Sequence, residues 1–213
     1  MTKLKLDISV SADGYVAGPD PSMDDPLGKG GEQLHEWVVK LAAWRDPHGL
    51  EGGERTRDDE IVREHVSSIG ATIMGRKMYS GGSGPWEDDP NAGGWWGDEP
   101  PFGHSIYVLT HHAREPVDKG DGVFYNFVTE GIEAALERAR EQAGDKDIAI
   151  GGGADVAQQY LNADLVDEVQ LHVAPVLLGS GTRLLDNLDP SRSVKLDRVV
   201  DSPDVTHIRY RVG

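Results

Sequence analysis

The segment Ile148-Ala149-Ile150-Gly151-Gly152-Gly153-Ala154-Asp155 runs from an apolar stretch into three glycines and then into a sequence suited to a helix. A short apolar run bounded by glycines is typical of a buried strand. Glycines lack a Cβ and let the backbone approach a pyrophosphate, while a helix N-terminus offers free N–H groups. Three glycines can equally form a simple tight turn, so this segment alone leaves both interpretations open.

Strand and helix patterns alternate along the rest of the chain. Alternating or short apolar runs predict strands at 3–10, 15–18, 71–74, 105–110, 123–128, 147–150, 169–174, 194–200 and 205–212. Apolar spacings of three and four predict helices at 32–43, 58–68, 130–142 and from the glycines to about 161. We therefore expect a single α/β domain over residues 1–213, with a mostly parallel central sheet, antiparallel strands near the C-terminus and helices on both faces.

Two further strand ends carry polar residues. Gly75 is followed by Arg76 and Lys77, a guanidinium fork and an ammonium charge that suit a phosphate such as the one distinguishing NADPH from NADH. Thr110 and His111 could contact a ribose phosphate or stack on adenine. Each pair alone also fits an ordinary solvated surface. Together with the glycines they are more informative, because ligands of open α/β sheets bind at the carboxyl ends of strands.

The composition excludes several classes of function. The net charge of -16 repels phosphate backbones and anionic lipid, so we expect neither a nucleic-acid nor a membrane partner. There is no cysteine for a disulfide or thiolate site, and the eight histidines lack a paired-ligand spacing, so we expect no metal site. No apolar run approaches the roughly 18 residues of a membrane span, and the N-terminus lacks a secretory signal, which favours a cytoplasmic location.

The order of these motifs resembles the dihydrofolate reductase-like superfamily, and in particular its riboflavin-biosynthesis reductase branch, the RibD C-terminal domain. The resemblance rests on Met74-Gly75-Arg76, Val108-Leu109-Thr110, Ile150-Gly151-Gly152-Gly153, Gln159-Tyr160-Leu161, the stretch 166–181 and the stretch 9–17. It covers nearly the whole chain and is weakest at 19–58 and 81–103. It implies a three-layer fold of the dihydrofolate reductase type and, together with the prevalence of two-fold symmetry, a homodimer.

The resemblance also implies where NADPH would bind. The pyrophosphate would lie at Gly152 and Gly153, with Gly151, Ala154 and Asp155 beside them. The 2′-phosphate would face Arg76 and Lys77 next to Gly75, the adenosine would lie beside Thr110 and His111, and the nicotinamide would be bordered by Ala12, Val16 and Ala17.

The catalytic residue is harder to assign. Dihydrofolate reductases place an acid on the first long helix, but the predicted helix here has no acid on its apolar face, and Glu36 is the nearest carboxylate. Reduction by NADPH needs a proton source, which is an acid or ordered water. Asp13 is our candidate, because the riboflavin-type branch carries an Asp-Gly at this turn. The alternative is that Asp13 only caps the turn before Gly14.

An aromatic wall for a flat substrate could come from His35, Trp37 and Trp86, although tryptophans more often fill cores. The sequence thus predicts an NADPH-dependent reductase of a small planar nitrogen heterocycle, of the pterin or ribosylaminopyrimidinone type. The alternative is an NADP(H)-binding protein without reductase turnover, acting as a sensor or scaffold.

Overall fold

The computed structural model describes residues 2–98, 100–189 and 193–213. The strands are β1 (Leu4–Ser11), β2 (Tyr15–Ala17), β3 (Ile69–Gly75), β4 (Ile106–Leu109), β5 (Val117–Asp118), β6 (Phe124–Val128), β7 (Asp147–Gly152), β8 (Glu168–Ala174), β9 (Thr182–Arg183), β10 (Val194–Asp201) and β11 (Thr206–Val212). The helices are α1 (Glu36–Val39), α2 (Ala42–Arg45), α3 (Arg57–Ser68), α4 (Arg76–Ser80), α5 (Ile132–Ala143) and α6 (Ala154–Asn162), with 3₁₀ turns η1 (Gly31–His35), η2 (Asp46–His48) and η3 (Trp86–Asp88).

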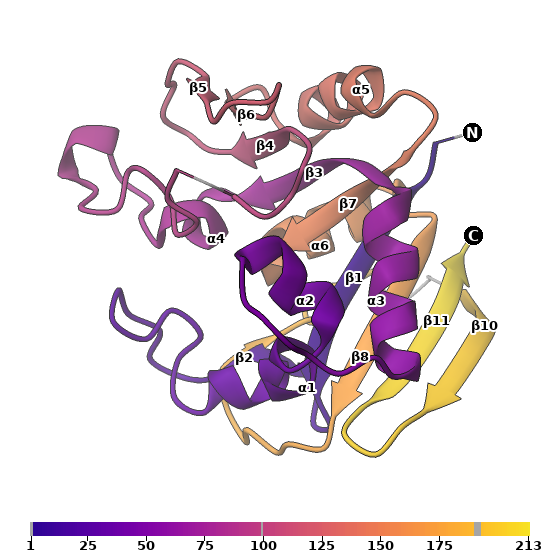
Figure 1. Cartoon of the computed structure of the whole chain (residues 1–213). Helices are drawn as coiled ribbons and strands as arrows, with labels where there is room; N and C mark the ends of the chain where they lie inside the picture. The colour runs from indigo at the N-terminus through magenta and orange to yellow at the C-terminus, as the bar shows by residue number, and fades with distance from the viewer. Residues whose placement is uncertain (1, 99, 190–192) are drawn as a thin grey trace.

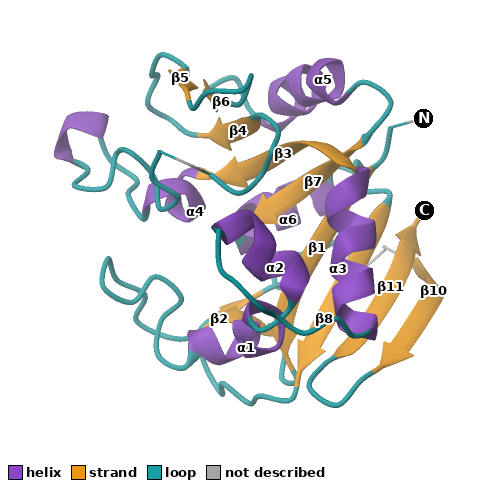
Figure 2. Ribbon diagram, viewed as in Figure 1, coloured by secondary structure: helices purple, strands orange, loops and turns teal. Residues whose placement is uncertain are grey.

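One large sheet runs through the molecule in the strand order β10-β11-β8-β1-β7-β3-β4-β6-β5. The strands from β8 to β6 are parallel to one another, whereas β10, β11 and β5 pair antiparallel with their neighbours. Helices α5 and α6 lie on one face, and α1, α2 and α3 lie on the other (Figures 1 and 2). The predicted α/β fold, with a mostly parallel sheet between two helical layers, is confirmed.

The two faces of β1 differ in chemistry. Leu4 and Leu6 are fully buried and belong to the main core, which α5 and α6 cover. The alternate residues Asp7, Ser9 and Ser11 face the other way, because successive strand side chains point to opposite faces. The face of the sheet beneath α3 and α1 therefore combines polar groups, of which Ser9 and Ser11 are buried, with a smaller apolar cluster around Trp37 and Leu41.

The prediction of one continuous helix at 32–43 is wrong, because the structure divides this segment into η1, α1 and α2. Leu41 is extended, with φ -76° and ψ 147°, which interrupts the helical hydrogen bonds. The Ala42 N–H donates to the carbonyl of Glu54 at 2.9 Å, and the Ala43 N–H donates to the Asp59 carboxylate at 2.5 Å. Tertiary partners that are distant in sequence thus replace the intrahelical bonds that the apolar spacing suggested.

Other elements follow the sequence more closely. The helices at 58–68 and 130–142 and the C-terminal hairpin of β10 and β11 are confirmed. The two-residue strands β5 and β9 were not predicted, because two residues carry no readable alternation.

Within the described residues, no helix combines the length and apolarity that crossing a membrane would require, and no group of three or more His, Asp or Glu side chains could hold a metal ion.

Candidate functional site

The three strand ends singled out in the sequence meet at one edge of the sheet. Strands β7, β3 and β4 are adjacent and parallel, so their carboxyl ends lie side by side. A Cβ placed on Gly75, at the end of β3, would lie 3.0 Å from the Val156 side chain of α6 and 3.8 Å from the Gly153 nitrogen. The glycines of both strands thus allow β3 and the start of α6 to pack closely.

The turn from β7 into α6 is an open backbone cradle. Gly152 has φ +125°, a conformation that favours glycine, and a Cβ there would meet Met78 Sδ at 2.7 Å. Gly153 caps α6 without a side-chain hydrogen bond and is exposed, and among the described residues no atom lies within 4 Å of a Cβ added to it. Open space thus adjoins the residue that caps α6, whose first N–H groups have no carbonyl partner within the helix, an arrangement suited to an anion such as a pyrophosphate. Asp155 is exposed in the same first turn. Its carboxylate interacts favourably with the positive end of the helix dipole but would repel a bound anion.

Arg76 is held inside the protein rather than extended toward solvent. Its side chain is 6% exposed, forms an ion pair with Asp89, donates from Nε to the Ser80 hydroxyl at 3.0 Å, and lies 3.1 Å above the Trp86 ring. Within the described residues, its Nη1 is buried and has no hydrogen-bond partner. The predicted basic pair is thus divided: Lys77 is exposed, while Arg76 could offer a phosphate only Nη1.

Thr110 and His111 form a turn directly after β4. The Thr110 hydroxyl accepts a hydrogen bond from the His112 N–H at 3.2 Å, and Thr110 is buried. His111 is exposed beside it. The Trp86 indole N–H donates to the His112 carbonyl at 2.8 Å, which joins this turn to the Arg76 cluster. Of these two residues, His111 is therefore the one whose side chain is accessible to a ligand.

The end of β1 is organised by Asp13. The Asp13 carboxylate accepts hydrogen bonds from the Ser11 hydroxyl at 2.6 Å and from the backbone N–H groups of Leu178 and Gly179 at 3.1 and 2.7 Å. The Ser11 bond outweighs partial burial and, with the Gly179 and Leu178 bonds, lowers the pKa of Asp13 to about 2. Asp13 is ionised at neutral pH, so the geometry favours the loop-fastening alternative over a proton donor.

The residues predicted to border a nicotinamide follow the same strand. Ala12 is exposed and its N–H donates to the Val176 carbonyl at 2.9 Å. Val16 packs against the main core, and a Cβ on Gly181 would lie 2.2 Å from the Ala17 carbonyl oxygen. Ala12 and Gly153 are thus exposed at the ends of β1 and β7, which are neighbouring parallel strands.

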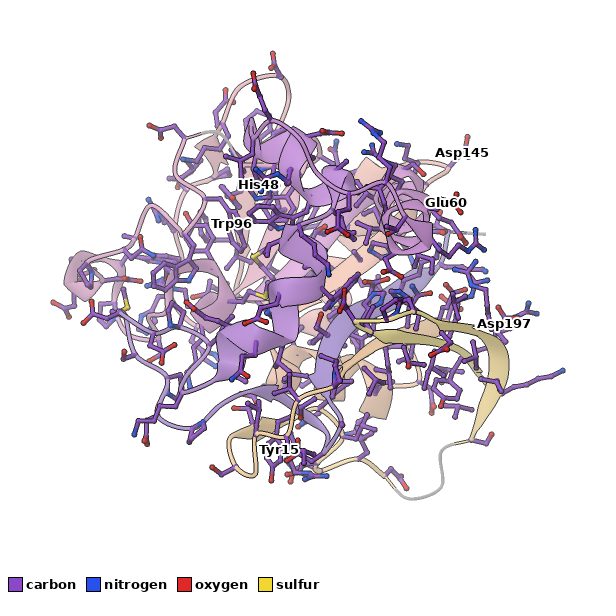
Figure 3. All side chains as sticks on the ribbon, turned by 60° about the horizontal axis from the view of Figure 1, so that its bottom comes forward. Tyr15, His48, Glu60, Trp96, Asp145 and Asp197 are labelled. Carbon is purple, nitrogen blue, oxygen red and sulfur yellow. The ribbon has the colours of Figure 1, made fainter. Side chains whose placement is uncertain are left out.

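A cation near this edge was missed by the sequence analysis. Arg183 of β9 lies with its guanidinium carbon 4.8 Å from the Tyr15 ring, and a Cβ on Gly14 would lie 3.0 Å from Arg183 Nη2. Figure 3 shows Tyr15 well away from Asp197 of the β10–β11 hairpin. No local signal marks Arg183, because β9 is defined only by its pairing with β2.

The predicted aromatic wall does not form. Trp37 is 4% exposed, its indole N–H donates to the Ser9 hydroxyl at 3.0 Å, and its ring packs against His172 and His207 at centroid distances of 4.7 and 5.2 Å. Trp86 belongs to a different cluster, over Arg76. Trp37 is therefore a core residue, the alternative that the sequence left open.

His35 keeps the features of a ligand-facing side chain. It is half-buried, and its Nδ1 is buried without a hydrogen-bond partner in the described part of the chain. Burial, with a smaller contribution from His172, lowers the pKa of His35, so the ring is neutral at neutral pH. A neutral ring with an unused nitrogen can exchange hydrogen bonds with a substrate.

The sequence model of one family, the RibD C-terminal domain, matches residues 2–208. The chain belongs to this family. Among curated proteins it is 25% identical over 213 residues to the uncharacterised protein YwjB of Bacillus subtilis, covering 98% of this chain and 97% of YwjB. It is 22% identical over 200 residues to the uncharacterised protein YyaP of the same organism, covering 91% of this chain and 86% of YyaP.

Solved structures of the RibD type share the fold. A putative riboflavin biosynthesis protein from Shewanella sp. PV-4 superposes with a TM-score of 0.62 at 20% identity, covering 100% of this chain and 99% of that one. The riboflavin biosynthesis reductase Rib7 of Saccharomyces cerevisiae superposes with a TM-score of 0.52 at 13% identity, covering 100% and 90%. This RibD C-terminal domain thus has the dihydrofolate reductase-like fold that the sequence motifs predict.

Proposed function

We propose that this RibD C-terminal domain is an NADPH-dependent reductase that transfers hydride to a small planar nitrogen heterocycle, of the ribosylaminopyrimidine or pterin class. One observation carries the proposal: Gly153, the residue that caps the N-terminus of α6, is exposed with open space beside it. That cradle lies at the carboxyl edge of a parallel sheet, where ligands of such sheets bind. Membership of the RibD C-terminal family, whose fold Rib7 shares, supports the reductase chemistry.

The residues at this edge would divide the work of holding the cofactor. Gly152, Gly153 and the α6 N-terminus would hold the pyrophosphate, while Lys77 and Arg76 Nη1 would face the 2′-phosphate. His111 and Thr110 would border the adenosine, and Ala12, Val16 and Ala17 the nicotinamide. The bound nicotinamide would supply the hydride. The protein's own contribution is then to position substrate and cofactor and to exclude water.

Asp13 enters this proposal as a positioning residue. Its ionised carboxylate fixes the backbone of Leu178 and Gly179 beside the end of β1. The proton that follows hydride transfer would then come from ordered water. His35, with its unused Nδ1, remains our candidate contact for the heterocycle.

The proposal is tested by titrating the purified protein with NADPH and separately with NADH, following nicotinamide fluorescence and thermal stabilisation. Gly153→Val is the diagnostic variant, because Gly153 has φ -80° and no atom of the described residues lies within 4 Å of a Cβ added there, so we expect the new side chain to fill the cradle. We expect it to abolish nucleotide binding while leaving the melting temperature of the free protein unchanged. Gly93→Val is the matched control, since Gly93 also has open space around it. Undiminished NADPH binding by Gly153→Val would overturn the assignment.

A second function, NADP(H) binding without turnover, is favoured by the placement of the carboxylates. Glu36 is exposed and Asp13 is ionised, so neither presents a carboxylic acid to a substrate. Saturable NADPH binding without oxidation across a panel of pterins and ribosylaminopyrimidines would support a sensor or scaffold. Substrate-dependent oxidation of NADPH would rule this function out.

We further propose that the protein is a cytoplasmic homodimer that pairs through the β10–β11 hairpin. Val194, Leu196 and Val199 of β10 are 55, 57 and 52% exposed, while Arg198 and Arg209 form ion pairs with Glu64 of α3. These three side chains form an uncharged apolar patch on a chain of net charge -16. The same patch on a second copy of the chain can pack against it without charge repulsion. Sedimentation should show twice the 23.1 kDa chain mass, and Leu196→Asp should yield monomers. A wild-type protein that sediments only as a monomer would contradict the proposal.

A further inference from the structure

Four side chains beneath α3, three of them buried and Asp7 partly exposed, form one unbroken chain of hydrogen bonds. Asp58 Oδ1 lies 3.0 Å from His207 Nε2, the Nδ1 atoms of His207 and His172 lie 2.6 Å apart, and His172 Nε2 lies 2.8 Å from Asp7 Oδ1. His172, His207 and Asp58 are 3, 2 and 6% exposed. None of these four residues is among those assigned above to the glycine cradle or to the cofactor and substrate contacts, although His172 contributes to the lowered pKa of His35.

The fold fixes this chain from four separate elements. His172 of β8 and His207 of β11 stand directly opposite each other in the antiparallel register. Asp7 comes from β1, the parallel neighbour of β8, and Asp58 comes from the first turn of α3. The Trp37 ring packs on both imidazoles. The rings are therefore held in place and shielded from solvent.

The three contacts require three protons. Each contact between a carboxylate and an imidazole needs one hydrogen, and two Nδ1 atoms 2.6 Å apart need one between them, since two facing lone pairs repel and two facing N–H groups clash. Two ionised carboxylates and two neutral imidazoles carry only two protons. The four hydrogen-bonded side chains therefore hold one proton more than two ionised carboxylates and two neutral imidazoles would carry, whichever atoms it resides on. Their net charge is -1.

The surroundings favour one additional proton and disfavour a second. Burial pushes the pKa of Asp7 upward, but His65 and His172 outweigh it and hold that pKa well below its usual range, so Asp7 remains an anion beside His172. Burial lowers the pKa of His207, with Asp58 opposing and His172 reinforcing the shift, so both rings do not become cations together. Among the described residues, the charged or titratable groups that interact with the pair or with its partners are Asp58 and His65 of α3, Asp7 of β1, His35 of η1 and Lys40 after α1. Glu168 of β8 and Arg209 of β11, which pair with each other, lie on the same two strands as the histidines.

We propose that Asp58, His207, His172 and Asp7 form a proton-binding site, which retains one proton in the folded protein at neutral and mildly alkaline pH. The unfolded chain releases this proton, because free histidine is neutral above a pKa of about 6.5. The retained proton fastens α3 and Trp37 to β1, β8 and β11. His65, 3.3 Å from the other Asp7 oxygen and 20% exposed, gives the proton a route to solvent.

The first test is the pH dependence of unfolding between about pH 7 and 9. A folded state that holds one more proton than the unfolded state loses stability as pH rises, tenfold in the folding equilibrium constant per pH unit. We expect this slope in the wild type and in the control His48→Gln, which changes an exposed ring. His207→Gln should lose it, because an amide NH₂ can donate to both Asp58 and His172 and needs no additional proton. Equal slopes in the wild type and His207→Gln would overturn the proposal.

The second test uses the wild type alone, so it holds even if His207→Gln does not fold. Nuclear magnetic resonance of protein labelled with ¹⁵N in histidine counts the ring protons of His172 and His207 at pH 8. We expect a strongly downfield proton bonded between the two Nδ1 atoms, in addition to one proton on each Nε2. Two ring protons in total, with none between the rings, would overturn the proposal.

Discussion

The glycine cradle at the start of α6 and the histidine chain beneath α3 use polar groups in opposite ways. The cradle is made of backbone at the start of α6, where Gly153 is exposed and no atom of the described residues lies within 4 Å of an added Cβ. The histidine chain is made of side chains, is nearly sealed from solvent, and pairs each ring nitrogen with a partner. Polar groups left open suit an external ligand, whereas groups satisfied among themselves stabilise the fold. Substitutions should therefore alter ligand binding in the first region and stability in the second.

The largest expected effect is on stability, from Asp58→Ala. The substitution leaves the His207–His172 pair buried with one carboxylate missing, and loss of one member of a buried ionic group costs about 3–5 kcal/mol. Urea unfolding should show this loss. Asp204→Ala, which removes the half-exposed partner of Lys40, is the control and should cost less than about 1 kcal/mol. Similar losses in the two variants would remove the distinction between the closed region and the surface.

Arg76→Ala tests whether Arg76 stabilises the fold, like the histidine chain, or binds a ligand, like the glycine cradle. Its ion pair with Asp89, whose side chain is 2% exposed, and its stacking on Trp86 predict a loss of roughly 3 kcal/mol in unfolding free energy. The double variant Arg76→Ala/Asp89→Ala should be more stable than Arg76→Ala alone, because no carboxylate is then left buried and unpaired. Unchanged stability in Arg76→Ala, together with weakened NADPH binding, would instead make Arg76 a dedicated ligand residue.

The contrast between the two regions also explains what the sequence could predict. The glycine cradle is contiguous, so a strand, three glycines and a helix were readable in eight residues. The histidine chain joins residues up to 165 positions apart, and no local pattern marks His172 as the partner of Asp7. The same limit applies to the first helix, whose interruption at Leu41 depends on Glu54 and Asp59. The assignment of Trp37 to a substrate wall failed because its burial depends on His172 and His207.

Asp13→Asn should have an intermediate effect that separates positioning from proton donation. The folded pKa of about 2 lies below the unfolded value of about 3.9, so this carboxylate contributes stability above the unfolded pKa and loses it as pH falls through 2. Asp13→Asn should therefore flatten the acid limb of the stability profile between about pH 4 and 2. With turnover as the readout, we expect a higher KM and less than about a tenfold loss of kcat. A loss of kcat by 10²–10⁴ would restore Asp13 as the general acid.

The smallest expected effect concerns Lys77, the exposed cation of the divided basic pair. A single flexible ammonium on a phosphate contributes about 1.4 kcal/mol, so Lys77→Ala should weaken NADPH binding by about tenfold and leave NADH binding unchanged. Lys195→Ala on the distant β10 strand controls for the loss of one positive charge from an acidic protein. The difference between NADPH and NADH should shrink as salt is added, because an exposed charge is screened. If Lys77→Ala weakened both nucleotides equally, the phosphate facing Lys77 would be the pyrophosphate, and recognition of the 2′-phosphate would rest on Arg76 Nη1 alone.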